Sequence, residues 1–322
     1  MHRPRALTSA VAGLTALLAL AAVAHAQTAP LEAYSSPLVR TLSFDYRAWN
    51  GTVRTAYLML PAWYGPHDDP PIPLVISPHG RGVDPRINER YWGDLPGRDT
   101  FAVVNPSGEG RRLGLYSWGA PGDIDDLARM PGLIRRAFPW VRIERDRVYA
   151  AGSSMGGQET LLLVARHPAL LAGAAALDSD TNLGRRYADF AALPDGLGLQ
   201  QLLAEEVGGT PNEAPAAYAA RSPSDFTRAL AFSKVPLQIW WSTNDRIVVD
   251  QARESGKLYE AILRANPSAP VTETVGTWAH SCELPRALPI VLAKWGIASP
   301  PSPPEAAPPA SAAPSREASS VR

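Results

Sequence analysis

The residues best suited to chemistry form the run Gly152-Ser153-Ser154-Met155-Gly156-Gly157. It contains one G-x-S-x-G match, centred on Ser154, which follows the apolar stretch 147–151 and opens a helix-like stretch. A turn this tight leaves no room for side chains at its flanking positions, so glycine is needed there. The sharp turn places the serine oxygen above the sheet. Ser153 does not fit the pattern, because its flanking positions hold alanine and methionine. The run therefore predicts Ser154 as a nucleophile; a glycine-rich turn without chemistry is the alternative.

A serine hydroxyl needs a base, and the pKa of histidine suits that task near neutral pH. Only His167 and His280 follow Ser154 in the sequence. His167 ends the helix that Ser154 opens, and at about 1.5 Å per residue it lies too far along that helix to reach the serine. His280 follows the last expected strand, where a loop can return over the serine. We therefore predict His280 as the general base.

The third group should be a carboxylate that accepts the histidine N–H. Asp245 follows the apolar run 237–242 after a short turn, with one helix and one strand before His280. Asp178 also ends an expected strand, 173–177. The spacing favours Asp245 and leaves Asp178 to line the pocket or brace a loop.

Stabilising a developing oxyanion requires two backbone N–H groups. The amide of Met155, which follows the serine, is one candidate. The second comes from Pro78-His79-Gly80-Arg81-Gly82, which follows an expected strand. Its glycines let the backbone approach a substrate, so we predict the Arg81 amide as the partner of Met155; an ordinary turn is the alternative.

Short apolar runs alternate with helix-like stretches, which predicts an α/β fold with a mostly parallel sheet and helices on both faces. The first two runs, 41–46 and 52–60, have the features of antiparallel strands. The later runs are nearly continuously apolar, as in strands covered on both faces: 73–77, 101–105, 147–151, 173–177, 237–242 and 271–275. Helices are expected at 123–137, 155–166 and 249–264.

The N-terminus has the features of a secretory signal peptide over residues 1–26. Arg3 and Arg5 precede an apolar run, and Ala24-His25-Ala26 forms a small-x-small cleavage site. An uncleaved anchor is the alternative, since the run is nearly long enough to span a bilayer. We expect a secreted, extracytoplasmic protein that has no stable membrane association after cleavage.

The rest of the chain divides into three expected parts, the second of which contains an insertion. An N-terminal segment, 27–39, precedes a catalytic domain, 40–297. Pro-, Gly- and Ala-rich sequence over about 180–234 interrupts the strand–helix rhythm and predicts a small insertion near the site. Residues 298–322 are rich in Pro, Ala and Ser, which predicts a disordered tail.

Composition excludes several classes of function. Lys plus Arg equals Asp plus Glu at 31 each, which argues against nucleic acid as a partner. No His, Cys and carboxylate cluster has metal-ligand spacing, and no phosphate-binding glycine loop is present, so we expect catalysis without a metal or another cofactor. Cys282 is the single cysteine, which forbids an intramolecular disulfide, and we expect it to be a small buried thiol. The oligomeric state is left open.

Several residues near these motifs are candidates for the substrate pocket. Trp118 and Trp278 fall in loops on the site side of the expected sheet, where aromatic walls would suit an aryl or sugar-linked ester. His79 and Asp178 sit at the ends of expected strands. Core packing is the alternative for each tryptophan.

The constellation resembles the α/β-hydrolase superfamily, particularly secreted serine esterases similar to polyhydroxyalkanoate depolymerases and to feruloyl or acetylxylan esterases. The resemblance covers about residues 40–296 and rests on His79-Gly80, the turn at Ser154, the run Asn244-Asp245-Arg246-Ile247-Val248, and His280. Many secreted polyester hydrolases close the histidine loop with a disulfide, which a single cysteine does not allow. The catalytic domain of prolyl-oligopeptidase-type peptidases is also similar, but those have an N-terminal propeller, and only about forty residues precede the expected domain here.

The resemblance and the residues together predict a serine hydrolase that cleaves carboxylic esters through an acyl-enzyme intermediate. The expected partner is a small-molecule or polymer ester. Peptide hydrolysis by a prolyl-oligopeptidase-like enzyme and ligand binding by a secreted protein with a degenerate site are the alternatives.

Overall fold

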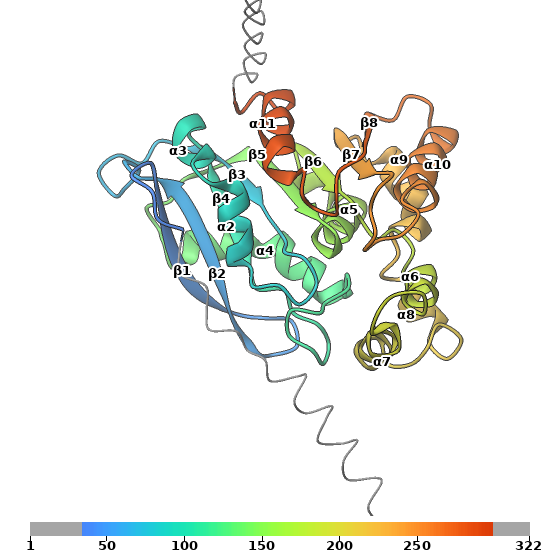
Figure 1. Cartoon of the computed structure of the whole chain (residues 1–322). Coiled ribbons are helices and arrows are strands. Elements are labelled where there is room, and N and C mark those ends of the chain that lie inside the picture. The colour runs from blue at the N-terminus through green and yellow to red at the C-terminus, as the bar shows by residue number, and fades with distance from the viewer. Residues whose placement is uncertain (1–33, 299–322) are drawn as a thin grey trace, which may run out of the picture.

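The computed structural model describes residues 34–298 (Figure 1). The expected signal peptide, most of the segment 27–39 and the tail from residue 299 onward lie outside the described residues. These parts of the sequence-based organisation stay predictions.

One sheet of eight strands forms the centre of the molecule, in the order β1-β2-β4-β3-β5-β6-β7-β8. β1 pairs antiparallel with β2, and β2 pairs antiparallel with β4, whereas all other pairs are parallel. The strands are β1 (Val39–Arg47), β2 (Val53–Pro61), β3 (Ile72–Ile76), β4 (Ala102–Pro106), β5 (Ile143–Ser153), β6 (Gly173–Leu177), β7 (Leu237–Ser242) and β8 (Val271–Gly276). The predicted mostly parallel α/β sheet is confirmed, and β5 differs most from its predicted bounds because it begins four residues earlier.

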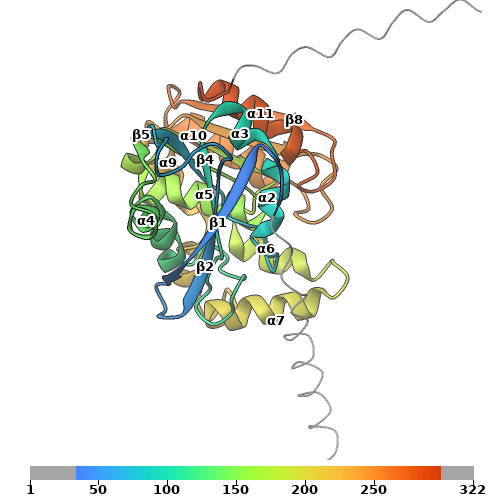
Figure 2. The ribbon, with the colours of Figure 1, turned by 90° about the vertical axis from the view of Figure 1, so that its left-hand side faces the viewer.

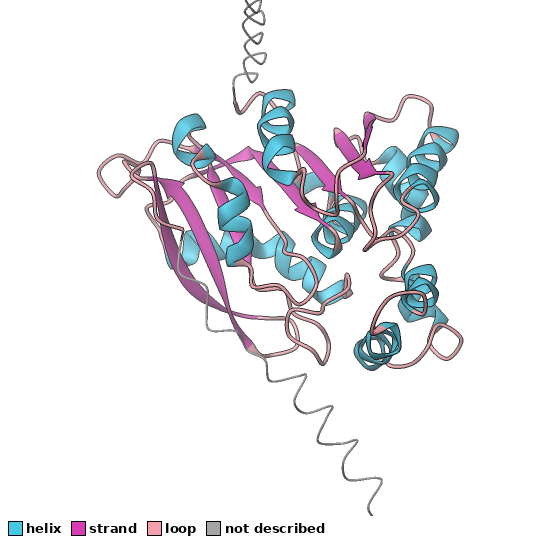
Figure 3. Ribbon diagram, in the orientation of Figure 1, coloured by secondary structure: helices cyan, strands magenta, loops and turns pink. Residues whose placement is uncertain are grey.

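Alternating side chains of the strands divide the core between the two faces of the sheet. Leu74 and Ile76 of β3 point into one apolar cluster. Four helices cover it: α4 (Pro121–Ala137), α5 (Met155–Arg166), α9 (Thr227–Phe232) and α10 (Lys257–Ala265). Val75 points into the opposite cluster, which α2 (Arg86–Trp92) and α11 (Leu284–Lys294) cover. Helices therefore lie on both sides of the sheet, as Figures 2 and 3 show. Burial on both faces is the reason that these strands read as continuous apolar runs.

The helices that cover the sheet were predicted in part. α4 (Pro121–Ala137) and α5 (Met155–Arg166) match the expected stretches. The expected helix over 249–264 is divided, because a π-helical turn, η3 (Ala252–Gly256), precedes α10 (Lys257–Ala265). The sequence patterns did not predict the following helices: α2 (Arg86–Trp92), α3 (Leu95–Asp99) and α11 (Leu284–Lys294).

The segment between β6 and β7 is helical despite its Pro, Gly and Ala content. It contains α6 (Leu183–Phe190), α7 (Gly196–Val207), α8 (Pro215–Ala219), the 3-10 helix η2 (Pro223–Phe226) and α9 (Thr227–Phe232). Another 3-10 helix, η1 (Pro168–Leu170), precedes β6. α6, α7 and α8 pack around their own apolar cluster, which includes Met155 beside the serine turn. α9 instead contributes Leu230 to the core beneath the sheet. The expected insertion of 180–234 is thus two different parts, and only the first lies over the serine turn.

No helix within residues 34–298 has both the length and the apolar character needed to cross a membrane.

Candidate active site

Ser154 stands between the end of β5 and the start of α5. Its backbone has φ 59° and ψ −126°, a conformation that non-glycine residues rarely adopt. The Ser154 amide donates to the Leu177 carbonyl of the neighbouring strand β6 at 2.9 Å, which holds the turn against the sheet. A Cβ atom at Gly152 would collide with the Gly156 backbone, so glycine is required for the chain to turn this sharply. Strained serines on such turns are typical of nucleophiles.

His280 and Asp245 meet across the loops that follow β8 and β7. His280 Nδ1 lies 2.7 Å from Asp245 Oδ2. Asp245 Oδ1 also accepts from the amides of Ile247 and Val248 at 2.8 and 3.0 Å. Burial opposes ionisation of Asp245, but the hydrogen bonds from His280 and from these two amides outweigh it and lower its pKa. An ionised Asp245 accepts the N–H at Nδ1 and leaves Nε2 of His280 as the proton acceptor.

Asp178, the competing carboxylate, holds the loop of His280 rather than its ring. Asp178 Oδ2 accepts from the Ser281 amide at 2.9 Å and from Trp278 Nε1 at 2.9 Å. These two donors flank His280 in the sequence. Burial is the main reason that the pKa of Asp178 is raised to about 6. The loop-bracing alternative for Asp178 agrees with these contacts.

Asp178, Asp245 and His280 are also the one group within residues 34–298 whose donor atoms lie close enough to hold a metal ion, within 4.8 Å of one another. The Oδ2 atom of Asp178 already accepts from two N–H groups, and Asp245 Oδ2 accepts from His280. Hydrogen bonds among the loops that follow β6, β7 and β8 therefore account for the cluster.

The two amides predicted to face an oxyanion are both free. Neither the Arg81 amide nor the Met155 amide donates a hydrogen bond to any residue of the part of the chain that the structure describes. Their two segments touch, because a Cβ atom at Gly156 would meet the carbonyl oxygen of Pro78. Gly82 has φ +64°, and Tyr116 fills the space where its side chain would stand. The loop after β3 thus lies directly against the first turn of α5.

His79 does not line an open pocket, contrary to the sequence-based expectation. It is fully buried, and its Nε2 accepts from the Gly108 amide at 2.8 Å. Nδ1 must then carry the proton, which it donates to the Gly80 carbonyl at 2.6 Å. Burial lowers the pKa of His79 to about 4, so the ring is neutral at pH 7. His79 braces the loop that carries Arg81.

The two candidate tryptophans do not form a solvent-facing wall. Trp118 is fully buried, and its amide lies 3.4 Å from the sulfur of Met155. Trp278 is half-buried and donates its indole N–H to Asp178. The packing alternative holds for Trp118, whereas Trp278 positions the loop of His280.

Other residues near the site depart from the sequence-based expectations. Cys282 is exposed rather than buried. His167 stands at the C-terminal end of α5, away from Ser154, and its Nε2 atom contacts Asp125 of α4. This position agrees with the prediction that His167 is not the general base. Ser153 Oγ lies 2.7 Å from Ser281 Oγ, a contact that no local pattern indicates.

The sequence matches no protein-family model and no curated protein. Solved structures do match. S-formylglutathione hydrolase from Staphylococcus aureus has 16% identity and a TM-score of 0.58, over 80% of this chain and 98% of that one. A fungal esterase from Rhizomucor miehei has 13% identity and a TM-score of 0.60, over 82% and 85% of the two chains. The chain has an α/β-hydrolase fold.

Peptidases share this α/β-hydrolase fold as well. A puromycin-hydrolyzing peptidase from Mycobacterium tuberculosis has 20% identity and a TM-score of 0.60, over 81% of this chain. This chain spans 39% of that peptidase chain and 41% of an acylaminoacyl peptidase from Pyrococcus horikoshii. The likeness to the peptidases is thus confined to one part of each.

Proposed function

We propose that this protein is a serine hydrolase that cleaves carboxylic esters, with Ser154 as nucleophile, His280 as general base and Asp245 as its orienting carboxylate. The observation that carries the proposal is the strained backbone of Ser154 (φ 59°) on a strand-to-helix turn, together with the 2.7 Å contact of His280 Nδ1 and Asp245 Oδ2. A buried carboxylate that fixes one histidine tautomer is the arrangement that acyl transfer by serine requires.

The reaction follows from these roles. His280 Nε2 takes the proton of Ser154 Oγ, and the oxygen attacks the ester carbonyl. The amides of Arg81 and Met155 hold the negative charge of the tetrahedral intermediate. The C–O bond to the alcohol breaks as His280 returns the proton to the leaving oxygen. Water, deprotonated by His280, then attacks the acyl-serine and releases the acid and free Ser154.

A secreted protein is part of the proposal. It is supported by the basic residues, apolar run and small-x-small site within residues 1–26. Mass analysis of the protein recovered from the medium of an expressing culture tests it, since cleavage after Ala26 is expected. Recovery of the uncleaved chain in the membrane fraction would contradict it.

Peptide hydrolysis is the second candidate, because peptidases are among the structures that share this fold over about 80% of the chain. The decisive experiment compares a series of 4-nitrophenyl esters with a peptide 4-nitroanilide, using the native chain and its Ser154→Ala variant. Ester cleavage that disappears in the variant supports the proposal. Cleavage of the anilide alone supports a peptidase, and no turnover of either substrate supports a binding protein with a degenerate site.

A further inference from the structure

Two arginine side chains converge beside the serine turn although they lie far apart in the sequence. Arg81 belongs to the loop after β3, and Arg186 belongs to α6. Both guanidinium groups pack against the ring of Phe190, at 5.3 Å and 4.4 Å from its centroid. Phe190 shares an apolar cluster with Met155, the residue after the proposed nucleophile.

These two cations have only one acidic partner. Arg186 Nε forms an ion pair with Asp180 Oδ1 at 2.8 Å, and only 3% of the Arg186 side chain is exposed. The Arg81 side chain forms no hydrogen bond or ion pair with any residue within 34–298. The Nη1 atom of each arginine is buried and has no hydrogen-bond partner within residues 34–298. One positive charge is therefore left without a counter-charge.

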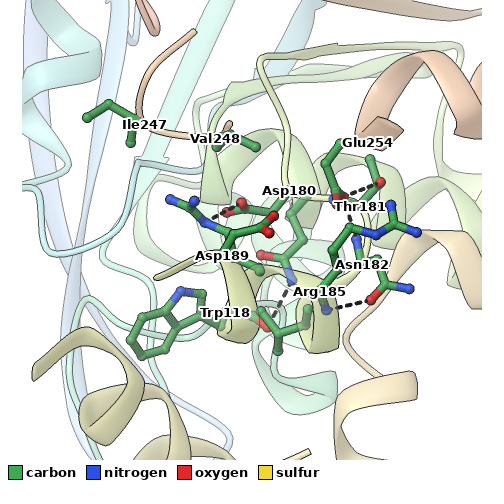
Figure 4. A network of polar contacts seen from close by, with 12 residues as sticks. Trp118, Asp180, Thr181, Asn182, Arg185, Asp189, Ile247, Val248 and Glu254 are labelled. Carbon is green, nitrogen blue, oxygen red and sulfur yellow. Dashed lines mark hydrogen bonds and ion pairs between the residues drawn. The ribbon is translucent and has the colours of Figure 1, made fainter. Parts of the chain in front are cut away.

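The neighbouring charges are already matched. Figure 4 shows Arg185 directed toward Glu254, with which it forms an ion pair of 3.1 Å. The carboxylate of Glu254 also accepts from the amides of Thr181 and Asn182 at 2.9 Å. Asp189 pairs with Arg253 at 2.7 Å. None of these carboxylates remains for Arg81.

Placing a second guanidinium beside a buried first one is unfavourable unless an anion joins them. Burial, and after it the charge of Arg186, lower the pKa of Arg81. Arginine nevertheless stays protonated at neutral pH, and its planar donors suit a carboxylate. A ligand carboxylate in contact with the partly exposed Arg81 would satisfy its free donors and offset the repulsion from Arg186.

We infer that Arg81, with the positive charge of the buried Arg186 beside it, recognises a carboxylate carried by the substrate, so that the preferred substrates are esters of anionic molecules. This inference rests on the proposed ester hydrolysis. Arg81 then has two roles: its backbone amide faces the oxyanion, and its side chain faces the substrate carboxylate. The loop that carries Arg81 lies against α5 at Gly156, two residues after Ser154.

The test compares matched anionic and neutral esters. For a carboxylate on the acyl side, kcat/KM is measured for 4-nitrophenyl hydrogen adipate and 4-nitrophenyl hexanoate, corrected for spontaneous hydrolysis. For a carboxylate on the alcohol side, acetylsalicylate is compared with phenyl acetate. We expect a preference for the anionic member in one pair, and that pair identifies the side. Arg81→Gln should lower the preference at least about tenfold, the size of effect for loss of one charged hydrogen bond.

Arg185→Gln is the matched control. It removes the same charge from the residue next to Arg186 in the sequence, but the Arg185 side chain is paired with Glu254. The preference should be unchanged in this variant. Arg186→Gln should lower it as Arg81→Gln does, and the melting temperature of each variant shows whether it folds. If Arg186→Gln does not fold, Arg81→Gln decides alone.

Binding separates this inference from the proposed reaction. Adipate should raise the melting temperature of Ser154→Ala and should not raise that of the Ser154→Ala, Arg81→Gln double variant. Hydrolysis of the neutral esters without any anionic preference would overturn the inference and leave ester hydrolysis standing. Absence of all ester hydrolysis, with the adipate effect intact, would overturn the proposed reaction alone. A preference that Arg81→Gln leaves intact would also overturn the inference.

Discussion

Ser153 Oγ and Ser281 Oγ lie 2.7 Å apart and join the serine turn to the histidine loop. Each hydroxyl is the immediate neighbour of a proposed catalytic residue, Ser154 or His280. The contact spans 128 positions of the chain and connects the end of β5 with the loop that follows β8. Such a contact would position the proposed base relative to the proposed nucleophile.

Removal of this hydrogen bond should slow catalysis more than it destabilises the fold. One hydrogen bond is worth about 1 kcal/mol, so Ser281→Ala should reduce kcat by about fivefold. The measurement is steady-state ester hydrolysis beside thermal unfolding. Ser153→Ala should have a similar effect, and the double variant should be little worse than either single variant. Additive losses in the double variant would show that the two hydroxyls act separately.

The two carboxylates near His280 should differ sharply in their effect on turnover. Asp245→Asn replaces the acceptor of the Nδ1 proton and favours the wrong histidine tautomer, so kcat should fall on the order of 10⁴-fold. Asp178→Asn leaves the histidine ring contact intact and should cost less than about tenfold. Ester hydrolysis by both purified variants measures the difference. The opposite order of effects would make Asp178 the orienting carboxylate.

Asp178 should also make stability depend on pH. Its pKa is about 6 in the folded protein, mainly because of burial, whereas the ordinary value is 3.8. Between these pH values the folded chain holds a proton that the unfolded chain has lost, so the contribution of Asp178 to stability falls as the pH rises. The melting temperature of Asp178→Asn relative to the native chain should therefore increase by several degrees from pH 4 to pH 7. A difference that stays constant with pH would show that Asp178 ionises normally.

Glycine at position 156 should be needed for both folding and activity. An added methyl group would meet the backbone oxygens of Pro78 and His79, which belong to the loop that carries the Arg81 amide. Gly156→Ala should lower the melting temperature and reduce kcat at least about tenfold. Gly132→Ala is the control, because nothing lies within 4 Å of its added methyl group and it lies inside α4. This control should gain up to about 1 kcal/mol of stability, and a loss of activity in it would point to a general effect of such substitutions.

Much of the fold and part of the site follow from local patterns. The strands could be predicted from continuous apolar runs. Helices cover both faces of the sheet, so the side chains on both faces of these strands are apolar. The glycines around Ser154 predicted the sharp turn, because side chains do not fit there. His280 followed by elimination, since only two histidines come after the serine. Such inferences succeed where a few neighbouring residues determine the backbone.

Local patterns were less informative for the helices that contain or adjoin proline and glycine. α11 contains Pro289 in its interior, and α6 to α8 lie in a Pro- and Gly-rich segment. Tertiary packing outweighs weak helix propensity in these elements, since their apolar side chains are buried against the sheet or around Met155.

By itself, then, the sequence determined the α/β architecture, the turn at Ser154 and the candidate base. Only the tertiary structure decided that Asp245 rather than Asp178 contacts the His280 ring, and that His79 and Trp118 are buried. It alone brought Arg81 beside Arg186 and exposed Cys282. The reason is physical: strand and turn patterns depend on nearest neighbours, whereas these contacts depend on how loops from distant strands fold together at one edge of the sheet.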